Sequence, residues 1–563
     1  MADLYSPGVQ VKEIDLTNVV PSVSSTIGAM AGAFQWGPCE EITTVTSETE
    51  LVDQFGKPNA DTFESVLSAA QFLSYGNALK VVRAVGTSAR NATASGTGIL
   101  AKNDSHFDTL TIAAGDWVMA RHPGVIGTAL TVEVATDPSS WTANASWKLW
   151  TDSAPGTSAG AAAVGGSNDE IHIVVRDFTG AITGTAGSVL ESFQHLSQAN
   201  DVKAEDGTTL YYKDHINARS KWIRIGNHSA ASGKALTDAG ESAAGNAFTR
   251  VNVFFSNLSG GVDDNALTLG ETTAMYNKFA DAETVDLSLV FQANSGLSNT
   301  ETRTLSNYIT ALCAARKDAV GFVSPERAAT VGVAVPLTPV AAWRTNLTST
   351  SYGFADSSSL YVYDKYNDVY RWICAAGSMA GLAANADLTA DAWFSPAGFT
   401  RGNVRNVTKL AWNPNQADRD ELYRTGVNPI VTFPGQGTVL FGDKTIQSKA
   451  SAFDRINVRR LFIVLEKAVS TASKASLFEF NDEFTRAQFR NMVEPFLRDV
   501  QGRRGITDFK VVCDGTNNTG NIIDSNKFVA DIYVKPARSI NFITLNFIAT
   551  RTGVEFSEIA GGN

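Results

Sequence analysis

Cysteine is scarce in this sequence. The four cysteines, Cys39, Cys313, Cys374 and Cys513, lie far apart, show no CxxC spacing and have no partnered histidine. This pattern argues against a disulfide framework and against a cysteine-based zinc site. We expect buried, reduced thiols, as in a protein that assembles in a cytoplasm.

Long apolar runs and an excess of basic residues are also missing. No stretch approaches the roughly 20 apolar residues that span a bilayer, and the opening MADLYSPG lacks the basic and apolar regions of a signal peptide. The chain has 46 Lys and Arg against 57 Asp and Glu, a net charge of −11. We therefore expect no direct contact with a membrane, and no direct contact with nucleic acid.

Recognisable catalytic motifs are few. Residues 156–160, GTSAG, match G-x-S-x-G and place Ser158 where a hydrolase nucleophile would lie. That chemistry requires a strand before the serine and a helix after it, whereas the surrounding SAPGTSAGAAAVGGS favours a loop. A surface hydrolase or glycan-binding protein, with its site in 91–265 and Ser158 paired with a histidine, is one hypothesis from a different functional class.

Cofactor and metal motifs are weak. SGKA at 232–235 has Ala235 where a phosphate loop needs Ser or Thr to bind magnesium, and the glycines of 180–187 lack the dinucleotide spacing. The six histidines show no i, i+4 pair with a glutamate partner. Asp263 and Asp264 fit a solvated turn better than a cation site. We expect no enzymatic activity, no cofactor and no metal.

Length and composition indicate several domains. A chain of 563 residues is too long for one hydrophobic core, which predicts two to four domains. From about 91 to 265 the sequence is rich in Gly, Ser, Thr, Asn and Asp, with short strands such as LTVEVA and IHIVVRD. We interpret this segment as a β-rich domain inserted into the first one, because no linker-like tract surrounds it and inserted domains are tolerated at loops.

Strands and helices alternate on both sides of that segment. FESVLSAAQFLSYG (63–76) has the spacing of an amphipathic helix, and the strand LKVVRAV follows it. After residue 284, VDLSLVFQ predicts a strand, TETRTLSNYITALCAARKD a helix and AVGFVSP another strand. This order predicts an α/β core with parallel strands where the helix crosses over. The expected fold class is α/β (α+β) and multi-domain.

The last hundred residues begin with two helical patterns. The first is NVRRLFIVLEKAV, residues 457–469. The second covers 482–504, where apolar residues recur at helical spacing and Asn481 is the expected cap. Pro495 lies inside this run and should kink or break the helix.

Two strand patterns follow near the C-terminus. SINFITLNFIA (539–549) is apolar on both faces, which predicts a strand in a sheet interior. TGVEFSE alternates Val554 and Phe556 with polar residues, as a strand with one exposed face does.

Taken in order, these C-terminal segments resemble the C-terminal domain of tail sheath proteins from contractile-tailed bacteriophages, and most closely the large multi-domain sheaths of myoviruses. The opening LYSPGVQVKEIDLTNVVPSVSSTIGAMAGAFQWGP resembles the start of that family. NPIVTFPGQGTVLFGDKTI at 428–446 resembles its strand–Pro-Gly–strand element, and 377–398 resembles its helix leading into a Trp-x-x-Pro-Ala loop. ARHPGVIGTALTVEV at 120–134 resembles the family's Pro-Gly-x-x-Gly-x-x-Leu element, and 173–197 followed by 206–223 resembles the insertion of the larger sheaths.

The resemblance implies a structural subunit of a virion. Such subunits would assemble in the host cytoplasm as hexameric rings stacked around a tail tube protein, between baseplate and tail terminator proteins. The sheath would contract from a metastable extended state and drive the tube through the host envelope.

The resemblance also implies six regions along the chain. They are an N-terminal arm (1–20), a first segment of the sheath core (21–90), an inserted outer domain (91–265), a second segment of the sheath core (266–445), a C-terminal inner domain (446–549) and a C-terminal arm (550–563).

The two arms are the candidate links between subunits. Exposed strand edges invite strand addition, and the resemblance implies that each subunit donates its arms to neighbouring sheets. The alternative is that both arms fold back on their own domain. The arm residues with strand character are Val9, Val11, Ile14, Leu16, Val554 and Phe556.

The charged residues of 482–504 are the candidate contacts with the tube. In the family the C-terminal domain faces the tube through polar and charged side chains, and charges at an interface set its register. The alternative is a solvated helix face with i, i+4 pairs. The candidates are Asp482, Glu483, Arg486, Arg490, Arg498, Arg503 and Arg504.

A second structural alternative is the sheath of a phage-tail-like bacterial injection system. The large insertion favours a phage.

Overall fold

The computed structural model describes residues 24–541, except 114–115, 227–235, 237 and 294–296. These residues divide between two compact units, Met1–Leu477 and Phe478–Asn563. Within the described residues, no helix combines the length and the apolar character that crossing a membrane requires.

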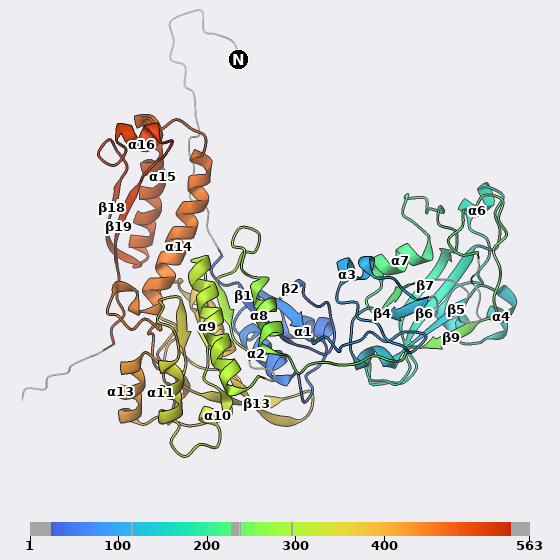
Figure 1. Ribbon diagram of the computed structural model, residues 1–563, viewed down its shortest axis with the longest axis horizontal. Helices are drawn as coiled ribbons and strands as arrows, with labels where there is room; N and C mark the ends of the chain where they lie inside the picture. Colours follow the sequence, from blue (N-terminus) through green and yellow to red (C-terminus); the bar gives the residue numbers. More distant parts are fainter. Residues whose placement is uncertain (1–23, 114–115, 227–235, 237, 294–296, 542–563) are drawn as a thin grey trace, which may run out of the picture. The chain divides into compact units, whose positions relative to one another are not determined.

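A six-stranded sheet forms the centre of the first unit (Figure 1). Its order is β12-β11-β10-β1-β3-β2, and every neighbouring pair is parallel except β3 and β2. The prediction of parallel strands around a crossover helix is therefore confirmed for β10 and β11. The strands are β1 (Gly28–Ala33), β2 (Ile42–Val45), β3 (Leu79–Ala84), β10 (Leu289–Phe291), β11 (Val320–Val323) and β12 (Gly353–Ala355).

Helices cover both faces of this sheet. The side chains of α2 and α12 share one hydrophobic cluster with the sheet, and those of α8 and α9 share another. The crossover helix α9 starts at a capping box, in which Ser298 and Glu301 satisfy each other's backbone N–H groups. The helices are α2 (Phe63–Leu73), α8 (Leu269–Asn277), α9 (Asn299–Arg316) and α12 (Ala376–Thr389).

Small residues let α12 approach α2 closely. The helix reads AGSMAGLAANADLT, and ten of its fourteen residues are buried. A Cβ on Gly377 would lie 2.4 Å from the carbonyl oxygen of Ser68, so only glycine fits there. The close approach of the two helices lets both pack against the same face of the six-stranded sheet.

The first unit has further elements outside this sheet and outside the segment between β3 and α8. A three-stranded antiparallel sheet has the order β14-β13-β15, and β16 and β17 form the hairpin expected around the Pro-Gly at 434–435. The elements are β13 (Ser359–Asp364), β14 (Val369–Cys374), β15 (Lys409–Leu410), β16 (Ile430–Phe433), β17 (Gly437–Leu440), α1 (Glu48–Phe55), α10 (Arg327–Thr330), α11 (Leu337–Thr345), α13 (Gln416–Thr425) and α14 (Ile456–Ser473).

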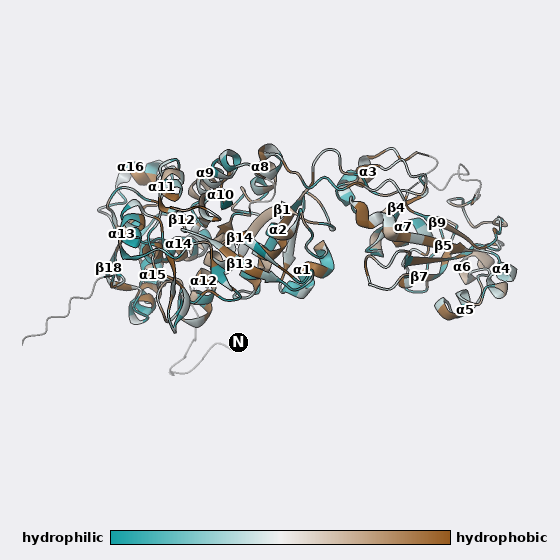
Figure 2. Cartoon of the chain, turned by 90° about the horizontal axis from the view of Figure 1, so that it is seen from below, coloured by the Kyte–Doolittle hydropathy of each residue, from teal (hydrophilic) through white to brown (hydrophobic). Residues whose placement is uncertain are grey.

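The chain between β3 and α8 forms antiparallel sheets of its own. One has the order β7-β6-β5-β9 and the other pairs β4 with β8. Their apolar side chains make a separate cluster, and the brown stretches along these strands in Figure 2 mark it. The strands are β4 (Val118–Ala120), β5 (Leu130–Ala135), β6 (Glu170–Asp177), β7 (Ser188–Ser197), β8 (Ile223–Ile225) and β9 (Phe254–Asn257).

Five short helices connect these strands: α3 (Asp104–Thr109), α4 (Pro138–Ala143), α5 (Trp147–Trp150), α6 (Ala159–Ala163) and α7 (Tyr212–Arg219).

The second compact unit is one long helix packed on a hairpin. The buried side chains Phe489, Val493, Leu497 and Val500 line one side of α15, at the spacing that the sequence predicts. The hairpin pairs β18 and β19 antiparallel, from Ile506 opposite Pro536 to Val512 opposite Asp531. The elements are α15 (Glu483–Gly502), β18 (Ile506–Val512), α16 (Gly520–Asp524) and β19 (Asp531–Pro536).

Candidate assembly surfaces

The N-terminal cap of α15 is Asp482, so the prediction of Asn481 is wrong by one residue. The Asp482 carboxylate accepts the backbone N–H of Thr485 at 2.8 Å, and its bonds to Thr485 lower the pKa of Asp482. A carboxylate at this position also faces the positive end of the helix dipole. Asn481 instead donates to the carbonyl of Lys527 at 2.8 Å and so fastens the helix start to a later loop.

The expected break at Pro495 does not occur. The helix continues from Glu483 to Gly502 with the proline inside it. Pro495 and Asn491, whose carbonyl would otherwise accept the missing N–H, are both exposed. Water can therefore solvate that carbonyl, and the loss of one bond does not end the helix.

Two of the candidate tube contacts are engaged inside the second unit. The Nε of Arg486 donates to the Asn481 side-chain oxygen at 2.8 Å, and its Nη2 donates to the Asn481 carbonyl at 3.0 Å. Arg490 donates to the carbonyl of Cys513. Both arginines are only half-exposed and stabilise the fold of this unit.

The other candidate tube contacts face solvent. Glu483, Arg498 and Arg504 are exposed, and Arg503 lies 3.5 Å from Asp499 in an i, i+4 pair. Such a pair contributes little stability in water. These side chains are therefore available to a partner at small cost.

The arm residues lie outside the described residues. This applies to Val9, Val11, Ile14 and Leu16 at one end and to Val554 and Phe556 at the other. Most of the apolar run 539–549 also lies outside them.

Ser158 has the environment of a helix cap. Its hydroxyl donates to the carboxylate of Asp169 at 2.7 Å and accepts the N–H of Ala161 at 3.2 Å. The helix that it starts, α6, has five residues and follows a loop. The strand–serine–helix arrangement of a hydrolase nucleophile is therefore not formed here.

His172, His195 and the paired aspartates make structural contacts. His172 accepts the N–H of His195 at 3.0 Å and donates to the carbonyl of Ser153 at 2.9 Å, and burial lowers the pKa of His172. Asp263 and Asp264 accept backbone N–H groups at 2.8 and 2.9 Å, and so fix turns. Among the described residues, no group of three or more His, Cys, Asp and Glu is arranged to hold a metal ion.

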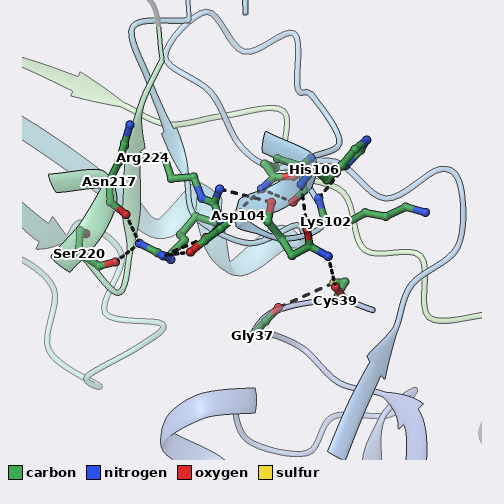
Figure 3. A network of polar contacts seen from close by, with 12 residues as sticks. Gly37, Cys39, Lys102, Asp104, His106, Asn217, Ser220 and Arg224 are labelled. Atoms are coloured by element: carbon green, nitrogen blue, oxygen red, sulfur yellow. Dashed lines mark hydrogen bonds and ion pairs between the residues drawn. The ribbon is translucent and has the colours of Figure 1, made fainter. Parts of the chain in front are cut away.

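A polar network joins the loop after β1 to the start of the inserted segment (Figure 3). Asn103 donates to the carbonyl of Cys39 at 3.0 Å, and Lys102 forms an ion pair with Glu40. Asp104 then accepts from Arg121 at 2.8 Å and from Arg224. Residues 102–104 therefore bond to the loop after β1, through Cys39 and Glu40, and to β8, through Arg224.

Arg83 is a second buried cation at this junction, besides Arg224. It extends from β3 and donates to four backbone carbonyls, those of Phe34 (2.9 Å), Gln35 (3.1 Å), Gly37 (2.8 Å) and Pro123 (2.8 Å). Only 1% of its surface is exposed, and burial lowers its pKa. The first three carbonyls follow β1, whereas Pro123 lies in the inserted segment, so one guanidinium fastens the core to the insertion.

The sequence contains a signal for this role that periodicity alone does not reveal. Arg83 is the only charged residue besides Lys80 in the strand LKVVRAV. An arginine among apolar strand residues needs buried acceptors, because an unpaired buried charge is costly.

Comparison with known families matches most of the chain. Three family models align in order: the Tail sheath protein Gp18 domain III N-terminal region over 25–84, the Phage tail sheath protein central domain over 272–446, and the Phage tail sheath C-terminal domain over 448–550. The tail sheath protein of Vibrio phage KVP40 is 34% identical over 99% of this chain and 100% of its own length. The chain belongs to the phage tail sheath family.

Other tail sheath proteins match over the same extent. Those of Enterobacteria phage T4 and Salmonella phage ViI are 33% and 32% identical over 99% of this chain, and over 99% and 98% of their own lengths. The predictions of a contractile-phage tail sheath and of a multi-domain α/β fold are therefore confirmed.

Solved structures share the fold at low identity. The sheath tail proteins of Desulfitobacterium hafniense and Listeria innocua reach TM-scores of 0.53, at 13% and 12% identity, over 95% and 92% of this chain and 97% and 96% of theirs. The helical sheath of the anti-feeding prophage in its contracted state reaches 0.51 at 12% identity, over 97% of this chain and 100% of its own. At this level of identity, the similarity shows a shared fold alone.

Proposed function

We propose that this sheath protein polymerises into stacked hexameric rings around a tail tube, and that it acts by mechanical rearrangement without catalysis. The observation that carries the proposal is the full-length match to phage tail sheath proteins at more than 30% identity. In this account the extended sheath is metastable. A signal at the baseplate releases contraction, and the tube passes through the host envelope.

The domain organisation in this proposal follows the sequence boundaries. The core would comprise residues 21–90 and 266–445, the inserted outer domain 91–265, and the C-terminal inner domain 446–549. Pairing of β1 with β10 across the inserted segment supports a core built from two separate stretches of chain. The junction at Arg83 supports an inserted domain that moves with the core.

The arms are proposed as the links between neighbouring subunits. Residues 5–20 and 550–560 would add strands to sheets of adjacent copies, because backbone pairing is directional and survives domain rotation. The hairpin of β18 and β19 supports this idea, since it is two-stranded among the described residues and short sheets gain stability from added strands.

The contact with the tube is proposed for the exposed charges of α15 and its caps. Asp482 and Glu483 at one end, and Arg498, Arg503 and Arg504 at the other, fit this role better than Arg486 and Arg490, because the last two bind backbone within their own unit. Tail terminator and baseplate proteins would contact the ends of the polymer. The finished sheath would belong to the virion and would be assembled in the host cytoplasm.

The experiment that tests this proposal compares the full chain with a version lacking residues 1–20 by negative-stain electron microscopy. We expect striated hollow tubes from the full chain and isolated particles from the shortened one. Tubes from both would refute the role of the N-terminal arm but not self-assembly. Compact particles from both at high concentration would contradict self-assembly.

A further inference from the structure

The second compact unit has two ends of different chemistry. At the start of α15, five large apolar side chains are more than a third exposed: Phe478 (104%), Phe480 (84%), Phe484 (69%), Phe528 (37%) and Ile523 (36%). We call this group the aromatic end. Single hydrophobic residues are common on surfaces, but several large ones together mark an interaction site.

Hydrogen bonds place the distant residues of this group beside the helix start. Asn481 contacts both Asn518, at 3.2 Å, and the carbonyl of Lys527. The ring of Phe528 lies 5.5 Å from that of Phe489, which is in the second turn of α15. The segment containing α16 therefore folds against the N-terminal half of α15, as Figure 1 shows.

The aromatic end is acidic. Six carboxylates outnumber its three cations, Arg486, Arg490 and Lys527, and the two arginines are half-exposed and donate to backbone carbonyls within the unit. The acidic residues are Glu479, Asp482, Glu483, Asp514, Asp524 and Asp531.

The opposite end of the unit is basic. The N–H of Ala537 donates to the carbonyl of Gly505 at 3.1 Å, which brings the end of β19 beside the end of α15. Asp499 and Asp508 pair with two of the cations there. We call the following group the basic end: Arg498, Arg503, Arg504, Lys535 and Arg538.

The two ends cannot meet within one unit. Helix α15 has 20 residues, which corresponds to about 30 Å at 1.5 Å per residue. Acidic residues at a helix start and basic residues at its end also complement the helix dipole. The dipole explains the distribution of charge, but it does not explain why five apolar side chains are exposed at one end.

We propose that the aromatic end of one copy docks on the basic end of a second copy. Guanidinium groups stack on aromatic faces and pair with carboxylates, so Arg498 and Arg504 of one copy can contact Phe480, Phe484 and Glu483 of the next. A second copy is the occupant because one chain carries both complementary surfaces.

The proposed contact is heterologous, since it joins two different surfaces. Repetition of a heterologous contact produces a closed ring or an open helix, which are the two ways in which sheath subunits could follow one another. This inference rests on the proposed self-assembly and adds to it the surfaces that set the order of the C-terminal units. Glu483, Arg498 and Arg504 also belong to the proposed tube contact, so the test uses the chain without tube protein.

The test uses charge reversal at both ends of the full chain. One variant carries Glu479→Lys and Glu483→Lys, and the other carries Arg498→Glu and Arg504→Glu; these four side chains are exposed. Each variant alone would place like charges against each other. We expect the concentration needed for polymer, measured by sedimentation and electron microscopy, to rise roughly ten-fold or more.

Mixing the two variants provides the decisive measurement. When the two variants alternate, the reversed, now positive aromatic end of the first variant faces the reversed, now negative basic end of the second. The next contact joins two unaltered ends. We therefore expect polymer to return in equimolar mixtures. A control with Glu205→Lys and Glu283→Lys has the same change of net charge as the first variant, at exposed positions of the first unit. The control should polymerise like the unaltered chain, and circular dichroism should show that all variants are folded.

The outcomes separate this contact from the proposed function. If the unaltered chain polymerises and both variants do so equally well, the contact is refuted while self-assembly stands. If each variant fails and the mixture also fails, the two ends do not bind each other and the proposal is refuted, while the proposed tube contact of the same charges stands. If the unaltered chain forms no polymer, the proposed self-assembly itself fails.

A second pair of substitutions tests the apolar component of the contact. Phe480→Ser and Phe484→Ser remove exposed rings and so should leave the unfolding midpoint unchanged. We expect this variant to polymerise poorly, and we expect no rescue by the charge-reversed partners. Normal polymerisation of this variant would contradict the docking role of the rings.

Discussion

Replacing Arg83 with methionine tests the junction between the core and the inserted segment most sharply. Methionine keeps much of the buried volume but removes all donors to the carbonyls of Phe34, Gln35, Gly37 and Pro123. Those carbonyls would lose their charged partner in a region that excludes water. The substitution therefore perturbs hydrogen bonding far more than packing.

The expected loss of stability follows from buried polar groups. Leaving one buried group without its partner costs about 1 to 3 kcal/mol, although removing the Arg83 side chain also removes the cost of burying its charge. Because four carbonyls are affected, the free energy of unfolding should still fall by about 3 to 5 kcal/mol. Arg83→Lys keeps the charge but cannot reach four acceptors, so we expect an intermediate loss.

Urea unfolding followed by tryptophan fluorescence measures this effect. Trp36 directly follows two of the bonded carbonyls, and its ring lies 5.4 Å from that of Trp222 in the inserted segment. Arg250→Met, at an exposed position, is the matched control and should change stability by less than about 0.5 kcal/mol. An Arg83→Met protein as stable as this control would refute the structural role of the junction.

Three further predictions concern the first unit. Gly377→Ala should lower the free energy of unfolding by about 1 to 3 kcal/mol in urea titrations, because its Cβ would lie 2.4 Å from the Ser68 carbonyl; unchanged stability would contradict the close helix packing. Burial raises the pKa of Glu64 to about 8, so the folded state holds a proton that the unfolded state releases above its ordinary pKa of 4.5. Stability should therefore fall as pH rises from about 5 to 8, by up to about 1.4 kcal/mol per pH unit. Glu64→Gln should flatten this dependence in urea titrations, and an identical slope in both proteins would contradict the assignment. Ser158→Ala should weaken the cap of α6 by about 1 kcal/mol and leave polymerisation unchanged, whereas loss of a measured hydrolase activity would support the catalytic hypothesis.

Periodicity and turn residues predicted the local elements well. The crossover helix α9 begins one residue after its Ser298 cap, and the Pro-Gly of 434–435 lies in the hairpin turn between β16 and β17. Such features depend on neighbouring residues and are therefore readable in a single sequence.

The cap and the proline of α15 were harder to predict. Asn481 and Asp482 are both good caps, and the choice between them depends on where Asn481 finds its other partners, in a loop more than thirty residues away. Pro495 is tolerated because its side of the helix faces solvent, which periodicity suggests but does not decide.

Long-range contacts were the main omission. The partners of Arg83 come from two segments of the chain, so no local pattern indicates them. The charged residues of 482–504 also looked equivalent in the sequence. Only the fold distinguishes Arg486 and Arg490, which bind backbone, from Arg498 and Arg504, which face solvent.

We propose that this chain alone encodes a six-fold helical sheath. Cryo-electron microscopy of the polymer formed by the purified full-length protein tests it most directly, because the reconstructed cross-section of the tubes gives their rotational symmetry. We predict stacked rings of six subunits around an open channel wide enough for a tube. Ordered polymers with another rotational order would contradict the hexameric ring, and the absence of any ordered polymer across protein and salt concentrations would contradict the account as a whole.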